Sequence, residues 1–209
     1  MTPLPSATPS PIRAVLFDYG GVIAEEGFRA GLFALAGRQG LDPMTLLLAG
    51  ADAVYSSGFV LGQADERKFW AQLREETGLQ GSDEALTGEI LPRFTLRPAM
   101  LDLVAQLKDR GLLVGILSDQ TDWLERLEVR DRFFHHFDRV FNSWHWGKGK
   151  RDVTFFTEVA ADLGLAPGQI LFIDDLPGNV ARAQQAGMRA ILYPEEGGIA
   201  GLVEAGLRG

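Results

Sequence analysis

Four short apolar segments recur along the chain, and each has the composition of a buried strand. They span residues 14–17, 112–117, 170–173 and 189–193. Their positions are apolar almost without interruption, and do not alternate between apolar and polar. This pattern is typical of strands that are covered on both faces, as in a parallel sheet. The sequence therefore predicts four buried parallel strands.

Segments with the apolar spacing of helices separate these strands. One begins at Pro98 and ends before Gly111, and a second spans 153–163. A third spans 180–186, with Asn179 as its N-cap. Strands that alternate with helices predict an α/β fold with an open, parallel, Rossmann-like sheet.

One long stretch interrupts this alternation. Residues 28–92 contain three segments with helical spacing, and none with the pattern of a strand. We therefore expect a helical cap at 28–92, inserted after the first strand, and an α/β core formed by 13–27 and 93–209. Residues 1–12 include four prolines, which predict a flexible tail.

The composition places the chain among globular proteins and excludes several kinds of site. The 209 residues are 46% hydrophobic and 23% charged, and they contain no cysteine, which excludes disulfides and cysteine-based zinc sites. The net charge of -8 argues against a nucleic-acid partner. No apolar run approaches the ~20 residues of a membrane span, and the first residues lack the apolar region of a signal peptide. We expect a cytoplasmic protein without a membrane partner; the pattern indicates no particular oligomeric state.

Polar side chains follow three of the predicted strands at the point where each strand ends. Asp18 follows the first, Ser118 the second, and Asp174 with Asp175 the third. The carboxyl ends of parallel strands border the ligand crevice of such sheets, so these side chains should meet. Carboxylates gathered in one crevice repel each other unless a cation lies among them, and oxygen ligands favour Mg²⁺. A serine and a lysine would then suit a phosphoryl group, attacked by one carboxylate.

Four motifs in this order resemble those of the haloacid dehalogenase (HAD) superfamily. They read LFDYGGVI at 16–23, GILSDQ at 115–120, GKGKRDVTFF at 147–156 and LFIDDLPGNVARAQQAGM at 171–188. Each motif alone is weak, but four in order, each at a predicted strand end or in the following loop, are specific. The resemblance covers residues 13–193 and implies the subfamily with a helical cap between the first two motifs.

The resemblance implies a catalytic role for three residues. Asp18 matches the nucleophile of the first motif, and Ser118 matches the serine that holds a phosphoryl oxygen. Lys150 matches the lysine that balances the phosphoryl charge, and Lys148 is the alternative lysine in the same motif. The implied reaction is Mg²⁺-dependent hydrolysis of a small phosphorylated metabolite, a phosphomonoester, through an aspartyl-phosphate on Asp18.

The resemblance also implies a metal site and a phosphate site. Asp175 is the more direct metal ligand of the acidic pair, and Gly20 contributes only its main-chain carbonyl. The expected metal ligands are Asp18, Gly20, Asp174 and Asp175. The expected phosphate-binding residues are Gly20, Gly21, Ser118, Asp119 and Lys150.

Gly20 departs from the pattern of the family's phosphatases, which usually have aspartate two residues after the nucleophile. That aspartate protonates the leaving oxygen and then activates water, and such a group typically contributes ~10²–10⁴ in rate. The first alternative is a phosphatase in which water or another acid substitutes, with Glu25, Glu26 and Asp119 as candidate acids. Asp-x-Gly-Gly-Val resembles a branch of the superfamily that includes sugar-phosphate phosphatases. The second is a 2-haloacid dehalogenase, which needs no acid but dispenses with Mg²⁺. The third is a non-catalytic protein that binds a phosphorylated ligand.

Overall fold

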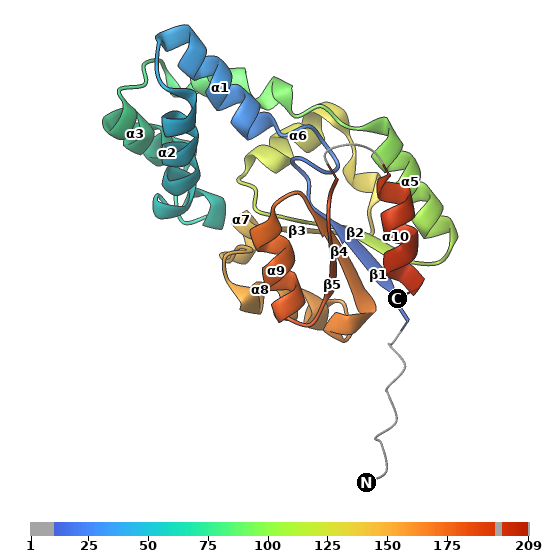
Figure 1. The fold of residues 1–209 in the computed structure, drawn as a ribbon. Coiled ribbons are helices and arrows are strands. Elements are labelled where there is room, and N and C mark those ends of the chain that lie inside the picture. Colours follow the sequence, from blue (N-terminus) through green and yellow to red (C-terminus); the bar gives the residue numbers. More distant parts are fainter. Residues whose placement is uncertain (1–10, 195–197, 209) are drawn as a thin grey trace.

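The computed structural model describes residues 11–194 and 198–208 of the chain. Within these residues, parallel strands form one sheet in the order β3-β2-β1-β4-β5, so β1 lies at its centre (Figure 1). The predicted α/β fold class is confirmed, and all four predicted strands are present. The strands are β1 (Ala14–Phe17), β2 (Leu113–Ser118), β3 (Arg139–Asn142), β4 (Ile170–Asp174) and β5 (Arg189–Leu192).

Helices cover both faces of the sheet. In Figure 1, α8 and α9 lie on one face, and α5 and α10 lie on the other. This explains the nearly unbroken apolar strands, because each face has its own apolar layer to contact. The helices after the insertion are α5 (Pro98–Asp109), α6 (Trp123–Asp131), α7 (Ser143–Trp146), α8 (Val153–Asp162), α9 (Pro177–Gln185) and α10 (Ile199–Arg208), with short 3-10 helices at η3 (Phe134–His136) and η4 (Pro167–Gln169).

The two apolar layers divide the side chains of β1 between them. Val15 and Phe17 belong to the cluster that includes Val203 of α10. Leu16 points the other way and belongs to the cluster that includes Phe156 of α8. Successive strand residues alternate between faces, so a central strand without polar positions is held from both sides. The end of β1, where Asp18 follows, is therefore fixed within the fold.

Between the loop after β1 and the start of α5, the chain forms a series of helices. We call this segment, residues 27–93, the inserted helices. It comprises α1 (Gly27–Gln39), α2 (Pro43–Ser56), η1 (Phe59–Leu61), α3 (Glu66–Thr77), α4 (Asp83–Ile90) and η2 (Leu91–Arg93). Every residue of the segment is described, and no strand occurs among them. In Figure 1 the segment lies to one side of the sheet.

A buried aromatic contact joins the inserted helices to the rest of the fold. Trp123 of α6 is buried, and its ring centroid lies 5.6 Å from that of Phe59 and 6.5 Å from that of Phe28. Its indole nitrogen donates a hydrogen bond of 2.9 Å to Glu66 of α3. Packed aromatic rings bury large apolar areas, so this contact fixes the position of the inserted helices against α6.

Some elements differ from the sequence predictions. The helix expected at 180–186 begins at Pro177, and the prediction of Asn179 as its N-cap is wrong, because Leu176 occupies that position. Proline is preorganised for the first turn of a helix, which accounts for the earlier start. Strand β3 has no predicted counterpart, because only the two central residues of its sequence RVFN are apolar. Helices α6 and α10 were likewise not predicted.

Parts of the expected domain organisation fall outside the described residues. These are residues 1–10 of the expected tail, and 195–197 and 209 of the expected core. Ile12, also assigned to the tail, is buried in the apolar core. Within the described ranges, no helix is both long and apolar enough to cross a bilayer.

Tyr19 offers a test of the packing just after β1. Its ring stacks on those of Phe94 and Phe133, with centroid distances of 5.8 and 4.9 Å. Its buried hydroxyl finds no hydrogen-bond partner among the described residues. We expect Tyr19→Phe to raise the free energy of unfolding by about 1 kcal/mol, because it removes an unsatisfied polar group. Urea denaturation measures this change; a loss of stability would contradict the absence of a partner.

Candidate active site

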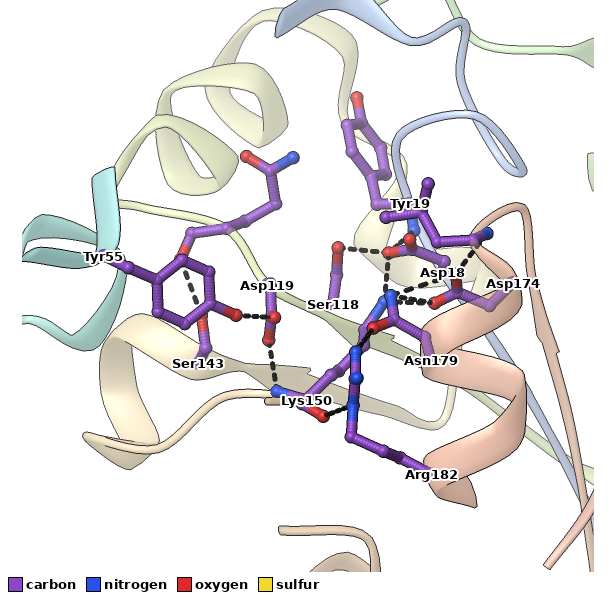
Figure 2. Close-up of polar contacts among 12 residues, drawn as sticks. Asp18, Tyr19, Tyr55, Ser118, Asp119, Ser143, Lys150, Asp174, Asn179 and Arg182 are labelled. Atoms are coloured by element: carbon purple, nitrogen blue, oxygen red, sulfur yellow. Dashed lines mark hydrogen bonds and ion pairs between the residues drawn. The ribbon is translucent and has the colours of Figure 1, made fainter. Parts of the chain in front are cut away.

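Polar side chains meet at the carboxyl ends of the three central strands. Asp18 directly follows β1, Ser118 ends β2, and Asp174 ends β4. Strands β2 and β4 are the two neighbours of β1, so parallel pairing brings these ends together. Figure 2 shows the three side chains and that of Lys150 pointing toward one another. The loops after the strands thus build the candidate site on a rigid base.

Asp18 is buried and held in one orientation. Its Oδ1 accepts hydrogen bonds from the Tyr19 main-chain nitrogen at 2.7 Å and from the Ser118 hydroxyl at 2.5 Å. The Lys150 ammonium lies 2.8 Å from the same oxygen. Burial raises the pKa of Asp18 well above its usual range, although Lys150 opposes this. Three donors on Oδ1 leave Oδ2 as the oxygen available to a ligand.

Lys150 lies between two carboxylates in the interior. It is 1% exposed, and its Nζ is 2.6 Å from Asp174 Oδ2 as well as 2.8 Å from Asp18 Oδ1. Burial alone would lower its pKa, but the two carboxylates outweigh burial and raise it, so the side chain stays an ammonium. Lys148 lies elsewhere and donates to Thr154 and Glu158. The structure therefore brings Lys150, and not Lys148, into the site.

The main chain of Lys150 is anchored from two sides. Its nitrogen donates to Asp119 Oδ1 at 2.8 Å, and its carbonyl accepts from Arg182 Nε at 2.6 Å. The other oxygen of Asp119 accepts from the hydroxyl of Tyr55 in α2 (Figure 2). Both oxygens of Asp119 thus have donors, so any phosphate contact from this residue would have to come from its main chain.

Asp174 is oriented by Asn179, a residue whose role the sequence analysis missed. The Asn179 amide donates to both oxygens of Asp174 at 3.0 Å, and its own oxygen accepts from Arg182 at 2.6 Å. The main-chain nitrogen of Leu176 adds a third donor to Asp174 at 2.8 Å. The spacing of three residues between Asn179 and Arg182, which puts both on one helix face, could have indicated this pair.

Asp175 completes a cluster of three carboxylates. One oxygen each from Asp18, Asp174 and Asp175 lie within 4.8 Å of one another. Burial, followed by the nearby charge of Asp174, raises the pKa of Asp175. Gly21 lies directly against it: its φ is +80°, and a Cβ there would be 2.2 Å from Asp175 Oδ2. A glycine is therefore required at position 21 for this carboxylate to reach the cluster.

The cluster fits a divalent cation. Three carboxylates face one ammonium, that of Lys150, which leaves an excess of negative charge when all three are ionised. All the donors are oxygen atoms, the ligands that Mg²⁺ prefers in proteins. Asp18, Asp174 and Asp175 could hold the ion, and Gly20 lies in the same loop after β1. Bringing three carboxylates together is unfavourable without a cation, and this donor set could hold a metal ion.

A cavity of about 620 Å³ opens between this cluster and the inserted helices. Its base is formed by Asp18, Ser118, Lys150 and Asp175, and α2 forms the opposite wall. Gly20 and Asp119 also line it, so most of the expected site residues border one space. Its size lies in the range of small-molecule sites.

Comparison with known proteins identifies the family. Residues 12–187 match the model of the family described as haloacid dehalogenase-like hydrolase, a hydrolase family. The chain belongs to this HAD-like hydrolase family. The resemblance inferred from the four motifs is thereby confirmed, while the subfamily with its particular cap is not decided by this match.

Among curated relatives of this HAD chain, enolase-phosphatase E1 of Aquifex aeolicus is 27% identical over 141 residues, which is 64% of this chain and 60% of the relative. Drimenol cyclase drtB of Aspergillus calidoustus is 39% identical over 57 residues, which is 27% of this chain and only 11% of the relative. The chain thus spans less than two thirds of either protein.

A solved structure supports the fold. A HAD family enzyme from Bacteroides thetaiotaomicron, in complex with magnesium and inorganic phosphate, superposes with a TM-score of 0.67 at 21% identity. The match covers 91% of this chain and 98% of the other. At this level of identity the likeness concerns the fold, which is the α/β fold predicted from the sequence.

Gly20 lacks the acidic side chain expected at this position of a HAD chain, and a Cβ there would lie 3.2 Å from Phe94 Cε1. The three candidate acids differ in their contacts. Glu25 is paired with Arg97 at 2.9 Å, which lowers its pKa, and Asp119 has donors on both oxygens. Glu26 caps α1 with one oxygen, since its Oε2 accepts from the Arg29 main-chain nitrogen at 2.6 Å, while its Oε1 lies 3.8 Å from where a Cβ on Gly20 would be. Burial raises the pKa of Glu26, and the residue lines the cavity.

The two lysines of the third motif provide a matched test of the buried charge cluster. We expect Lys150→Met to lower the free energy of unfolding by ~3–5 kcal/mol, because it leaves Asp18 and Asp174 buried without their cation. Lys148→Met removes the surface ion pair with Glu158, and should change the free energy of unfolding by no more than about 1 kcal/mol. Urea denaturation of both variants in EDTA at neutral pH measures the difference. Equal effects would contradict the central position of Lys150.

Proposed function

We propose that this HAD-family protein is a Mg²⁺-dependent hydrolase of small phosphomonoesters that acts through an aspartyl-phosphate on Asp18. The observation that carries the proposal is the position of Lys150 between Asp18 and Asp174 at the base of the cavity. A buried carboxylate next to an ammonium and a hydroxyl suits attack on a phosphoryl group. The relative named as an enolase-phosphatase, and the neighbour solved with magnesium and phosphate, support this assignment.

In the first step, an oxygen of Asp18 would attack phosphorus while the bond from phosphorus to the leaving oxygen breaks. Ser118 and Lys150 contact the other oxygen of Asp18, at 2.5 and 2.8 Å, and would donate to the phosphoryl oxygens. Their hydrogen bonds also hold the attacking carboxylate in one orientation. Such fixed donors stabilise charge that develops in the transition state.

The metal would be Mg²⁺, held by Asp18, Asp174 and Asp175 with the carbonyl of Gly20. When bound, it would offset the negative charge that the phosphoryl group brings to the carboxylates. Asn179 and Arg182 would keep Asp174 and the main chain of Lys150 in place, since their hydrogen bonds join the two. The chain itself thus positions every group around the phosphoryl site.

Glu26 is the group that we expect to replace the missing acid at Gly20. In its protonated form it would give a proton to the leaving oxygen in the first step. Its carboxylate would then take a proton from the water that attacks the aspartyl-phosphate, which releases phosphate and frees Asp18. Its position 3.8 Å from a Cβ on Gly20 supports this role.

The inserted helices would form a cap over the reaction, with the core on either side of them in the sequence. Tyr55 of α2 bonds to Asp119, and the hydroxyl of Ser143 bonds to the carbonyl of Val60, so helices and core are joined beside the cavity. A covered site keeps bulk water from the phosphoryl group and strengthens the electrostatic interactions within it. We take 28–92 as the bounds of this cap, as expected from the sequence.

The phosphatase proposal is tested first with 4-nitrophenyl phosphate, whose leaving group needs little protonation. We expect turnover that requires Mg²⁺ and falls to background in EDTA and in Asp18→Asn. Asp162→Asn, an exposed acid on α8, should retain full activity and controls for loss of charge. Turnover without metal, or halide release from a 2-haloacid, would favour the dehalogenase alternative. Phosphate binding without turnover would favour the non-catalytic one.

The role of Glu26 is tested by comparing two leaving groups. Glu26→Gln should lower kcat by ~10²–10⁴ with an alkyl phosphate, because the alkoxide needs a proton. With 4-nitrophenyl phosphate the loss should be much smaller. Glu25→Gln is the matched control and should leave the ratio of the two rates unchanged. Equal losses on both substrates in Glu26→Gln would show that this residue does not act as the acid.

A further inference from the structure

The cavity wall opposite the phosphoryl site is apolar. Leu47, Leu48, Ala51 and Val54 of α2 all line it. Their spacing along the chain places them on one side of the helix, so α2 presents a continuous apolar surface to the cavity. None of these side chains can contribute to phosphoryl transfer, and they need a different explanation.

Two exposed leucines continue this surface to the mouth of the cavity. Leu48 of α2 is 61% exposed, and Leu176 in the loop after β4 is 55% exposed. Both line the cavity, although they come from segments far apart in the sequence. Single exposed apolar side chains are common on protein surfaces, but two that border the same cavity beside an apolar wall indicate a contact surface.

The polar side chains near this wall already contact other parts of the protein. The hydroxyl of Tyr55 donates to Asp119, and the guanidinium of Arg151 lies 3.7 Å from the centre of the Tyr55 ring and donates to the carbonyl of Ala51. Arg182 donates to Lys150 and Asn179. A hydroxyl-rich leaving group such as a sugar would need polar partners along its length, and would lose affinity without them.

The remaining polar side chains are found at the other end of the cavity. Gln120 Nε2 and Glu26 Oε1 lie 3.7 and 3.8 Å from where a Cβ on Gly20 would be, next to Asp18. Arg29 lies beside Glu26, with 4.0 Å between the closest charged atoms. The cavity is therefore divided into a polar end at the carboxylates and an apolar side at α2, while Leu176 directly follows Asp175 and borders the same cavity.

We propose, on the basis of the phosphatase function above, that the substrate is a phosphomonoester of an apolar alcohol. Its phosphoryl group would lie at Asp18, Ser118 and Lys150, and its hydrocarbon part would lie along the apolar side of α2, reaching Leu48 and Leu176. The hydrocarbon supplies binding energy by leaving water. Because it does not react, it strengthens binding of substrate and transition state alike, and should act on KM rather than kcat.

The test uses n-alkylphosphonates from methyl to octyl, which bind without being hydrolysed. With native protein and Mg²⁺, calorimetry should show Kd falling by up to about fourfold for each added methylene until the apolar side is filled. Hydrolysis of the matching n-alkyl phosphates should show KM falling in parallel while kcat changes little. Glycerol phosphate should have a higher KM than propyl phosphate.

Substitutions of the two exposed leucines distinguish a loss of binding at the apolar surface from a general effect on folding. Leu48→Ser and Leu176→Ser should reduce the gain in affinity from butyl to octyl phosphonate, and should leave methylphosphonate binding unchanged. Met44→Ser is the matched control, because Met44 is also on α2 and 53% exposed but does not line the cavity. It should bind the whole series like the native protein.

The outcomes distinguish this inference from the proposed function. Hydrolysis of phosphate esters with a Kd that does not depend on chain length would overturn the apolar substrate and leave the phosphatase intact. Affinity that depends on chain length, without turnover of any ester, would support the apolar site and overturn the catalytic proposal. Absence of binding by every phosphonate would overturn the apolar site.

Discussion

The ion pairs of Lys150 with Asp18 and Asp174 are the interaction on which the rest of the site depends. A buried ammonium is unfavourable unless it is paired, and two buried carboxylates are unfavourable without a cation. Each charge is therefore tolerated only in the presence of the others. The surrounding hydrogen bonds from Ser118, Asn179 and the Tyr19 main chain complete the arrangement. The same geometry that makes the cluster tolerable leaves one oxygen of Asp18 free to react.

The sheet explains why these residues can be so far apart in sequence. Residues 18, 118 and 174 come together because β2 and β4 flank β1 in parallel, so their carboxyl ends share one edge. The apolar layers on both faces fix that edge of the sheet. The inserted helices pack against α6 through the contact of Phe59 with Trp123. The charged and hydroxyl side chains of the candidate site thus lie at the ends of the central strands, which are held on both faces. Recognition of the leaving group, in our proposal, belongs to α2, which lies outside the sheet and contacts the site through the bond from Tyr55 to Asp119.

Much of this arrangement was predictable because it follows from local patterns. Uninterrupted apolar runs revealed β1, β2, β4 and β5, and the polar residue at the end of each central strand pointed to the site. Strand β3 was missed because its stability comes from pairing with β2, which a sequence of two apolar residues does not reveal. The bonds of Asn179 to Asp174 and of Tyr55 to Asp119 were missed for the same reason, since each partner looks like an ordinary cap or surface residue until the chain is folded. The choice between Glu25 and Glu26 likewise required the direction of two adjacent side chains, which the sequence alone does not contain.

The Asp119 carboxylate has a consequence for how such chains can be recombined. One of its oxygens accepts from Tyr55 in the inserted helices, and the other accepts from the main chain that carries Lys150. A chimera that received its inserted helices from another family member would therefore keep a half-buried acceptor without its donor, unless the incoming helix also supplied a hydroxyl at the position of Tyr55. The helices that face the cavity and the loop that carries the lysine would therefore have to be exchanged together, although Tyr55 and Asp119 are 64 positions apart in the sequence.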